Sequence, residues 1–457
     1  MSSDFFLLTS NLSRLIQSLA DALFMPYVVA TLLGGGVFLT IRLGVVQVRR
    51  FPGAVRAMFA GAGDRAGMAG VLSPFQAFAT ALAASIGTGN IAGVATAIIS
   101  GGPGALFWIW VYGFVATATK FSEAVLGMRF RRVERGEVLS GPMYYLRDGL
   151  KSPTLAWVYA LVAGIAALAS TPFTQPNSIA VAVNSVFGVP NWIAGVVIAV
   201  LTWLVIVGGI TSIGRAMEKL APLKVGLYLA GGAVVIATFA DRLPDVLALV
   251  VREAWTTRSA MGFGIFVAMR YGIARGIYAN EAGFGTAAVA YATARSTRPA
   301  EQGLQAVMEV FIVSFVTATI SAMTILVTGV AEQSIADRQA GAAFVTSTAA
   351  VASAFNAAIP TVGGWVVALC AFLFGYTTLI GWAYYGEQFL EYLLGRRVTR
   401  PYRWIYCLLI PFGAVLAPEV VWAWADLMNA LQIFPNMIGL VALSGLAAKY
   451  AFETRRT

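Results

Sequence analysis

Two stretches of the sequence place glycine and polar residues in the middle of long apolar segments. The first, IGTGN at residues 86–90, lies at the centre of the apolar segment 72–99, and the second, RGIYANE at residues 275–281, lies at the centre of segment 262–291. Glycine costs about 1 kcal/mol relative to alanine inside a helix, and polar groups are costly in hydrocarbon. We therefore expect both helices to be interrupted there, inside protein or beside a water-filled cavity.

An interrupted helix exposes backbone groups that can bind a ligand. The amides at the N-terminus of one half-helix favour an anion such as a carboxylate, and the carbonyls at the C-terminus of the other favour a cation such as sodium. Alternatively, the glycines only allow helices to pack closely, and Gly89-x-x-x-Gly93 fits that pattern. Asn90, Asn280 and Glu281, at the same depth, favour the binding site.

The elements that carry these stretches are predicted to be membrane-spanning helices. Of the 457 residues, 59% are hydrophobic and 11% are charged, whereas soluble domains carry roughly 25% charged residues. A helix needs about 20 apolar residues to cross a bilayer. Apolar runs between charged or Gly/Pro-rich breaks give eleven candidate spans, near residues 21–44, 72–99, 104–128, 154–186, 192–210, 221–240, 262–291, 304–329, 363–393, 402–417 and 421–448. The fourth and ninth are long enough to require tilt or a kink.

Most Lys and Arg residues fall on one side of these segments, including Arg215, Lys219 and Lys224 near the start of the sixth. By the positive-inside rule that side is cytoplasmic, which predicts a multi-pass protein of the cytoplasmic (inner) membrane with its N-terminus outside and its C-terminus in the cytoplasm. This placement explains the net charge of +10 without a nucleic-acid partner. Lys120 is expected to reach the cytoplasmic interface and to pair with Glu123.

Segments two to six and seven to eleven form two blocks of five, each opened by an interrupted segment. Because five is odd, the second block enters the membrane from the opposite side, which predicts an inverted repeat. We place the blocks at residues 70–240 and 260–450, after an N-terminal part, 1–45, with an extra transmembrane helix. Residues 5–20 are expected to form an interfacial helix that is not removed as a signal peptide. The predicted fold is thus an all-α polytopic membrane protein of about 11 transmembrane helices.

The composition argues against an enzyme. The chain has no histidine, which excludes imidazole metal ligands and histidine proton relays, and we find no nucleophile–base constellation. Cys370 and Cys407 lie within apolar segments, so we expect small core residues and not a disulfide or metal pair. We expect no cofactor and no obligatory protein partner.

Several stretches closely resemble the alanine or glycine:cation (sodium) symporter family of the amino acid–polyamine–organocation superfamily. They are SPFQAFATALAASIGTGNIAGVATAIISGGPGALFWIWV, TKFSEAVLGMRFR, SGPMYYL, GIARGIYANEAGFGTAAVAYATA, IGWAYYGE and WADLMNALQIFPN. These stretches lie between residues 73 and 436, and the resemblance extends from about residue 40 to 440, nearly the whole chain. The resemblance implies a leucine-transporter-like, five-plus-five inverted repeat with one extra N-terminal helix. It also implies sodium-driven uptake of alanine or glycine, sometimes with proton coupling.

The resemblance further implies a substrate site around the two interruptions. The substrate carboxylate would meet backbone amides of the first, and the amino group and small side chain would face the fourth, seventh and ninth segments. The implied residues are Gly87, Thr88, Gly89, Asn90, Gln175, Gly276, Asn280 and Trp382. A bulky indole at Trp382 would favour glycine and alanine over leucine, unless it faces lipid.

The resemblance also implies a sodium site beside the substrate. The ligands would be the carbonyls of Ala83 and Ile86 and the hydroxyls of Thr377 and Thr378, because a hard cation prefers oxygen. The alternative is that both hydroxyls only bond to carbonyls of their own helix. Trp382 follows one turn after Thr378, so one helix would serve the ion and the substrate.

The chain departs from the family pattern in the eighth segment, where a GVFIDT-like stretch is expected. It has Val313 in place of the aspartate, and a glutamate, Glu309, one turn earlier. Glu309 either takes over the role of that carboxylate or marks the cytoplasmic end of the helix. Arg275 and Glu281 are separated by the predicted break, which would let them pair. We expect Glu281 to contribute to gating or ion coupling, with a structural ion pair as the alternative.

These observations predict a secondary active transporter that performs sodium-coupled symport (uptake) of small neutral amino acids such as alanine and glycine. Its partners would be the amino acid, the sodium ion and the lipid bilayer. Two alternatives are a proton-coupled transporter of another small amino acid and a transporter-like sensor that binds without translocation. A channel would also carry polar residues in the membrane, but its flux would not saturate.

Overall fold

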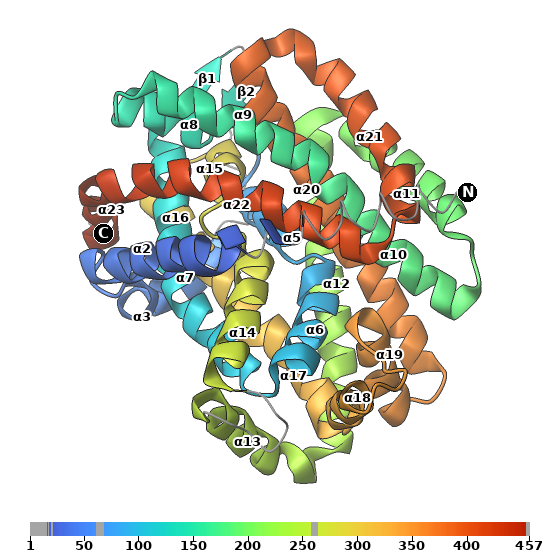
Figure 1. Cartoon of the computed structure of the whole chain (residues 1–457). Helices are drawn as coiled ribbons and strands as arrows, with labels where there is room; N and C mark the ends of the chain where they lie inside the picture. The colour runs from blue at the N-terminus through green and yellow to red at the C-terminus, as the bar shows by residue number, and fades with distance from the viewer. Residues whose placement is uncertain are drawn as a thin grey trace.

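The computed structural model (Figure 1) describes residues 16, 18–19, 22–60, 68–134, 136–256 and 264–453. Helices make up nearly all of this part of the chain. One two-stranded antiparallel hairpin joins β1 (Arg132–Glu134) to β2 (Glu137–Leu139). The interfacial helix predicted over residues 5–20 lies outside the described residues, apart from isolated positions near its end.

The N-terminal part and the first block follow the predicted order of segments. Before the first block lie η1 (Phe24–Val28), α2 (Val29–Arg42), α3 (Val46–Arg49) and α4 (Phe51–Ala60). The block itself contains α5 (Pro74–Ser85), η2 (Thr88–Asn90), α6 (Ala92–Gly101), α7 (Ala105–Phe130), α8 (Pro142–Tyr144), η3 (Tyr145–Gly149), α9 (Pro153–Ala169), α10 (Thr171–Phe187), α11 (Asn191–Ile206) and α12 (Gly209–Thr238). The pair α9 and α10 forms the fourth predicted segment, which divides at Ser170.

A connecting pair, η4 (Ala240–Arg242) and α13 (Leu243–Trp255), leads into the predicted second block. Its elements are α14 (Ile265–Asn280), α15 (Thr286–Ala290), η5 (Tyr291–Thr293), α16 (Pro299–Val310), η6 (Phe311–Thr317), α17 (Ala318–Val327), α18 (Val330–Gln339), α19 (Ser347–Ala358), α20 (Val362–Leu394), η7 (Arg396–Val398), α21 (Thr399–Val415), α22 (Pro418–Ala442) and α23 (Ser444–Phe452). The ninth predicted segment is one continuous helix, α20, of 33 residues.

The described helices include stretches that are long and apolar enough to cross a membrane. Four do so as single units by length and composition, namely Pro153–Phe187, Gly209–Thr238, Pro299–Val327 and Val362–Leu394. Two more are bent pairs, and one of them is α5 with the stretch Thr88–Gly101, at an angle of 61°. Both cysteines are buried and unpaired, as predicted.

The first interruption lies where the sequence predicts it. A capping box starts α5, because Ser73 and Gln76 exchange hydrogen bonds between side chain and backbone. The helix ends at Ser85, Gly87 is extended, and a short 3₁₀ turn leads into α6. Carbonyl and amide groups are therefore released from helical bonding within the protein interior.

The second interruption lies later than predicted. Residues 275–280 belong to the continuous helix α14, and the backbone leaves the helix at residues 281–285. Glu281 (φ 54°), Gly283 (φ 95°) and Gly285 (φ 86°) adopt left-handed conformations, which glycine adopts without strain. Gly276 instead allows close packing, because a Cβ there would lie 2.9 Å from the Tyr112 ring.

The sixth segment also differs from the prediction. Helix α12 begins at Gly209, so Arg215, Lys219 and Lys224 lie within a helix of 30 residues and not in a loop. Pro222 lies inside this helix without ending it. As a consequence Lys224 is fully buried midway along α12, whereas Lys219 is exposed.

Candidate substrate and cation site

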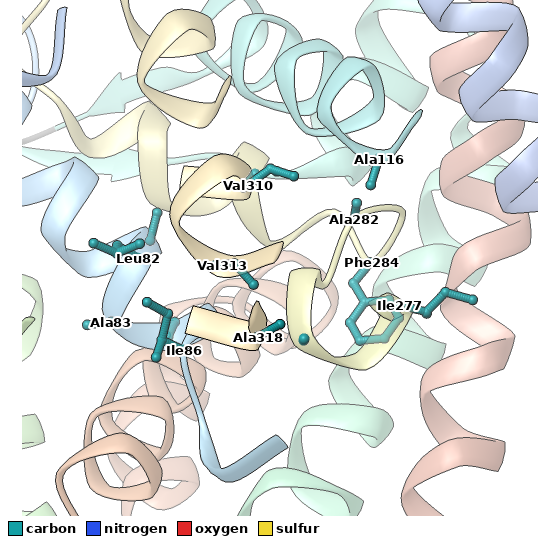
Figure 2. Packing of buried hydrophobic residues seen from close by; sticks show 14 of the residues in the cluster. Leu82, Ala83, Ile86, Ala116, Ile277, Ala282, Phe284, Val310, Val313 and Ala318 are labelled. Atoms are coloured by element: carbon teal, nitrogen blue, oxygen red, sulfur yellow. The ribbon is translucent and has the colours of Figure 1, made fainter. Parts of the chain in front are cut away.

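The two interruptions lie within one buried cluster. Figure 2 shows Ala83 and Ile86 of the first interruption, Ala282 and Phe284 of the second, and Val313 of η6, which all belong to this cluster. In Figure 1 this region lies near the centre of the molecule, where α6 and α14 run side by side. The segments predicted to form the site are therefore brought together.

At the first interruption a backbone amide faces an acceptor oxygen. The Thr88 amide and the Thr88 hydroxyl donate to Gln175 Oε1 over 3.1 and 3.0 Å. Gly87 lies against the same group, because a Cβ there would be 3.1 Å from Gln175 Oε1 and 2.8 Å from Thr378 Oγ1. Four of the predicted residues, Gly87, Thr88, Gln175 and Thr378, thus converge. Asn90 is buried behind them and donates to the Ser85 carbonyl over 3.2 Å.

The face of α14 that meets the first interruption carries Tyr278. A Cβ on Gly89 would lie 2.9 Å from the Tyr278 ring, and the Tyr278 hydroxyl donates to Thr174 Oγ1 over 3.2 Å. The predicted residues Gly276 and Asn280 face α7 and η6 instead. Asn280 donates to Ser314 Oγ over 2.7 Å. Tyr278 was not among the site residues predicted from the sequence. It lies two positions from Gly276 and two from Asn280, and therefore on the opposite face of the helix.

The four oxygens predicted to bind sodium lie close together, and a lysine lies among them. Lys224 Nζ donates to the Ala83 carbonyl (2.9 Å), the Ile86 carbonyl (2.6 Å) and Thr377 Oγ1 (2.6 Å). Thr378 Oγ1 donates to the Ala84 carbonyl over 2.8 Å. From the sequence, Lys224 was counted with Arg215 and Lys219 among the basic residues of the cytoplasmic side, near the start of the sixth segment.

Both threonine hydroxyls also reach a carbonyl of their own helix. The Phe374 carbonyl lies 3.1 Å from Thr377 Oγ1 and 3.1 Å from Thr378 Oγ1. Each hydroxyl has only one proton to donate. Each hydroxyl can therefore donate either to the Phe374 carbonyl of its own helix or to a carbonyl at the first interruption.

A second buried lysine pairs with the glutamate of the eighth segment. Lys120 Nζ lies 2.7 Å from Glu309 Oε1, and their side chains are 1% and 0% exposed. Ser85 and Tyr291 donate to the same carboxylate over 2.5 and 2.9 Å. The expected pair of Lys120 with Glu123 at the membrane interface is therefore wrong. Glu309 is not a marker of the cytoplasmic end of its helix, since it is fully buried.

Glu123 instead binds the second interruption. Its Oε1 accepts hydrogen bonds from the amides of Gly283 and Gly285 over 2.9 and 3.1 Å, and from Asn436 over 2.9 Å. The carbonyls of this turn accept from side chains: Tyr112 to Ala282 (3.2 Å), Asn436 to Gly283 (2.8 Å) and Tyr159 to Phe284 (2.7 Å). The irregular backbone is thus satisfied inside the protein, as the membrane interior requires.

The predicted gating residues do not pair with each other. The Trp382 indole donates to Glu281 Oε1 over 2.6 Å, and the Thr286 hydroxyl donates to Glu281 Oε2 over 3.1 Å. The Arg275 guanidinium lies 5.5 Å from the centre of the Trp422 ring. Helix α14 continues unbroken from Arg275 to Asn280, and the break begins only at Glu281. Because no break lies between the two residues, the helix keeps their side chains apart. Trp382 is 2% exposed and does not face lipid.

One face of the molecule joins the ends of both interrupted segments. Leu72, just before α5, forms a parallel bridge with Ala294, just after η5. The Arg131 guanidinium donates to four backbone carbonyls around this bridge, those of Ala69 (2.7 Å), Ala292 (2.5 Å), Ala294 (2.6 Å) and Ser296 (2.7 Å). By the predicted topology this is the cytoplasmic face.

Known proteins resemble the chain over nearly its full length. The sodium:alanine symporter family matches residues 9–455. The sodium/alanine symporter AgcS of Methanococcus maripaludis is 38% identical, over 94% of this chain and 95% of the relative. YrbD of Bacillus subtilis, named a putative sodium/proton-dependent alanine carrier protein, is 32% identical over 94% and 90%.

A solved structure shares the fold. The crystal structure of MhsT in complex with L-phenylalanine has a TM-score of 0.59 with 12% identity, and covers 84% of this chain and 99% of that chain. This likeness confirms the predicted five-plus-five architecture with two interrupted helices. The match of the family across the whole length, together with the identity to its curated relatives, shows that this chain belongs to the sodium:alanine symporter family.

Proposed function

We propose that this secondary transporter carries small neutral amino acids, alanine and glycine, into the cell across the cytoplasmic membrane by cation-coupled symport. The observation that carries the proposal is the convergence of Thr88, Gly87 and Gln175 at the first interruption. Two donors from Thr88 point at one oxygen acceptor there. A substrate carboxylate that displaces the Gln175 carboxamide oxygen would meet the same donors, at the end of a half-helix that favours negative charge.

The surroundings favour a small substrate side chain. Space beside Gly89 is limited, because a Cβ there would lie 2.9 Å from the Tyr278 ring. Trp382 packs against Phe284 of the second interruption with ring centres 6.3 Å apart, and its indole is fixed by the bond to Glu281. A branched side chain in this space would require several of these groups to move, so alanine and glycine are favoured over leucine.

The coupling ion of the proposed function is a monovalent cation. Sodium is the ion that the sequence predicts, and it is named in the family and in AgcS. YrbD is named for both sodium and protons. An inward gradient of the coupling cation makes uptake the direction of accumulation, because symport moves the ion and the substrate the same way.

The test is uptake of radiolabelled L-alanine into proteoliposomes. An inward sodium gradient and an inward proton gradient are imposed separately, with protein-free liposomes as the control. We expect accumulation above the external concentration under at least one gradient, saturation with alanine, and competition by glycine but not by leucine. Flux that only equilibrates alanine, or competition by leucine as strong as that by glycine, would contradict the proposal.

A further inference from the structure

The oxygen cage at the first interruption already holds the amino group of a lysine. Lys224 Nζ lies within hydrogen-bond distance of Ala83 O, Ile86 O and Thr377 Oγ1, and the side chain is fully buried. An ammonium group has three donors and no acceptor, so these three oxygens use all of its hydrogen-bonding capacity. The lysine is therefore coordinated as completely as a bound cation would be.

The chemistry of the cage fits one monovalent cation. Its three acceptors are neutral oxygens, and two of them are carbonyls at the C-terminal end of α5, where the helix carries partial negative charge. A sodium ion bound by the same oxygens would lie next to the ammonium group, away from water that could screen the repulsion. The ion and the lysine side chain thus compete for one position.

The position of Lys224 is not explained by packing alone. A buried charge is costly unless hydrogen bonds and partner charges compensate for it. Lys120 is compensated by a carboxylate, whereas the three hydrogen bonds of Lys224 in the described structure reach only neutral oxygens. The Phe374 ring, 5.1 Å from Nζ, adds a favourable cation–π contact. The oxygens of the cage supply the hydrogen bonds of Lys224, and the Glu281 carboxylate interacts with it only through space.

We propose that Lys224 is a built-in cation that takes the place of a sodium ion between the first interruption and α20. Substrate binding then needs no sodium at this position. This inference rests on the proposed function only for its link to alanine. Because the lysine is covalently part of α12, it cannot leave the cage for the cytoplasm, and a sodium gradient cannot be used there.

The experiment compares alanine affinity in sodium chloride with that in choline chloride at equal ionic strength. The full-length protein is purified in detergent, and L-alanine binding is measured by calorimetry. Lys224→Ala removes the charge and leaves room for an ion, whereas Lys224→Met removes the charge and fills the space. Lys219→Ala, an exposed lysine on the same helix, is the matched control.

We expect the sodium effect, which is the ratio of the alanine Kd in choline to that in sodium, to be at least about tenfold larger for Lys224→Ala than for the wild type. Lys224→Met should bind weakly in both salts, and Lys219→Ala should behave as the wild type. An equal sodium effect in Lys224→Ala and wild type would overturn the proposal. So would wild-type affinity of both variants in choline.

A second measurement needs no substrate. Sodium chloride alone should raise the melting temperature of Lys224→Ala above its value in choline chloride, and should do so more than in the wild type, because a ligand that binds the folded state stabilises it. Equal shifts would refute the built-in cation. Lys224→Thr serves the same test if Lys224→Ala cannot be purified. If alanine neither binds nor accumulates in the wild type, the proposed function fails, while the sodium-only measurement still decides the role of Lys224.

Discussion

The buried pair of Lys120 and Glu309 offers a quantitative test of the structure. Its atoms lie 2.7 Å apart, and both side chains are almost completely buried. Removal of one partner from a buried ion pair costs about 3–5 kcal/mol, because the other charge is left without compensation. Lys120→Met and Glu309→Gln should therefore each lower the free energy of unfolding by about that amount.

The double variant should be much less destabilised than the sum of the two single variants. A buried pair replaced by neutral groups of similar volume is often close to neutral in stability. We therefore expect a coupling energy of at least about 3 kcal/mol from the double-mutant cycle. The assay is unfolding of the purified protein in mixed micelles by increasing SDS, followed by tryptophan fluorescence and extrapolated linearly.

The exposed pair of Arg298 and Glu301 is the matched control. Its atoms lie 3.3 Å apart, and the arginine side chain is 65% exposed. Exposed ion pairs contribute about 0.2–1 kcal/mol, so the same cycle should give a coupling below about 1 kcal/mol. If the effects of Lys120→Met and Glu309→Gln simply add, the two groups do not interact in the folded protein and the reasoning fails.

Three further perturbations test other parts of the site. Gly87→Ala should weaken L-alanine binding at least about tenfold, measured by calorimetry, because the new methyl group would press on the threonine and glutamine beside it. Trp382→Phe removes a donor to a buried carboxylate and should cost about 1–3 kcal/mol of stability in the SDS titration. Arg131→Gln removes the guanidinium that bonds to four carbonyls. Hydrogen exchange of the amides in the bridge beside it should become roughly tenfold faster or more, read by mass spectrometry.

Each of these changes has a control in the same chain. Gly226→Ala introduces a methyl group where nothing lies within 4 Å and should bind alanine normally. Trp192→Phe changes an indole that is 60% exposed and should leave stability almost unchanged. Arg129→Gln alters an exposed arginine close to Arg131 and should leave the exchange rates unaffected. If a variant gives the same result as its control, the contact that the variant removes does not contribute to the measured property.

The architecture could be predicted from the sequence because apolar segments and breaks in them are local signals. The capping residues before α5 and the glycines after Ser85 fix the first interruption without reference to the rest of the chain. The second interruption was placed too early because glycine has two uses. Gly276 serves close helix packing, whereas Gly283 and Gly285 provide left-handed turns. Only their conformations separate these two roles.

The partners of the buried charges could not be predicted, because they come from distant parts of the chain. Lys120 lies three residues from Glu123, yet its ion-pair partner is Glu309. Lys224 seemed to belong to a basic loop, but α12 begins earlier and carries it into the interior. Local spacing reports which side chains share a helix face, and it contains no information on which helix lies opposite. Three of the oxygens predicted to bind sodium nevertheless lie together in the structure, around Lys224 Nζ.

The bridge between Leu72 and Ala294 bears on how this face could open. The two strands of chain are linked by backbone hydrogen bonds, and Arg131 bonds to carbonyls on both sides. A small separation of the two segments would break several of these hydrogen bonds at once and leave their carbonyls without donors. Partly separated arrangements of this face are therefore disfavoured relative to the closed one.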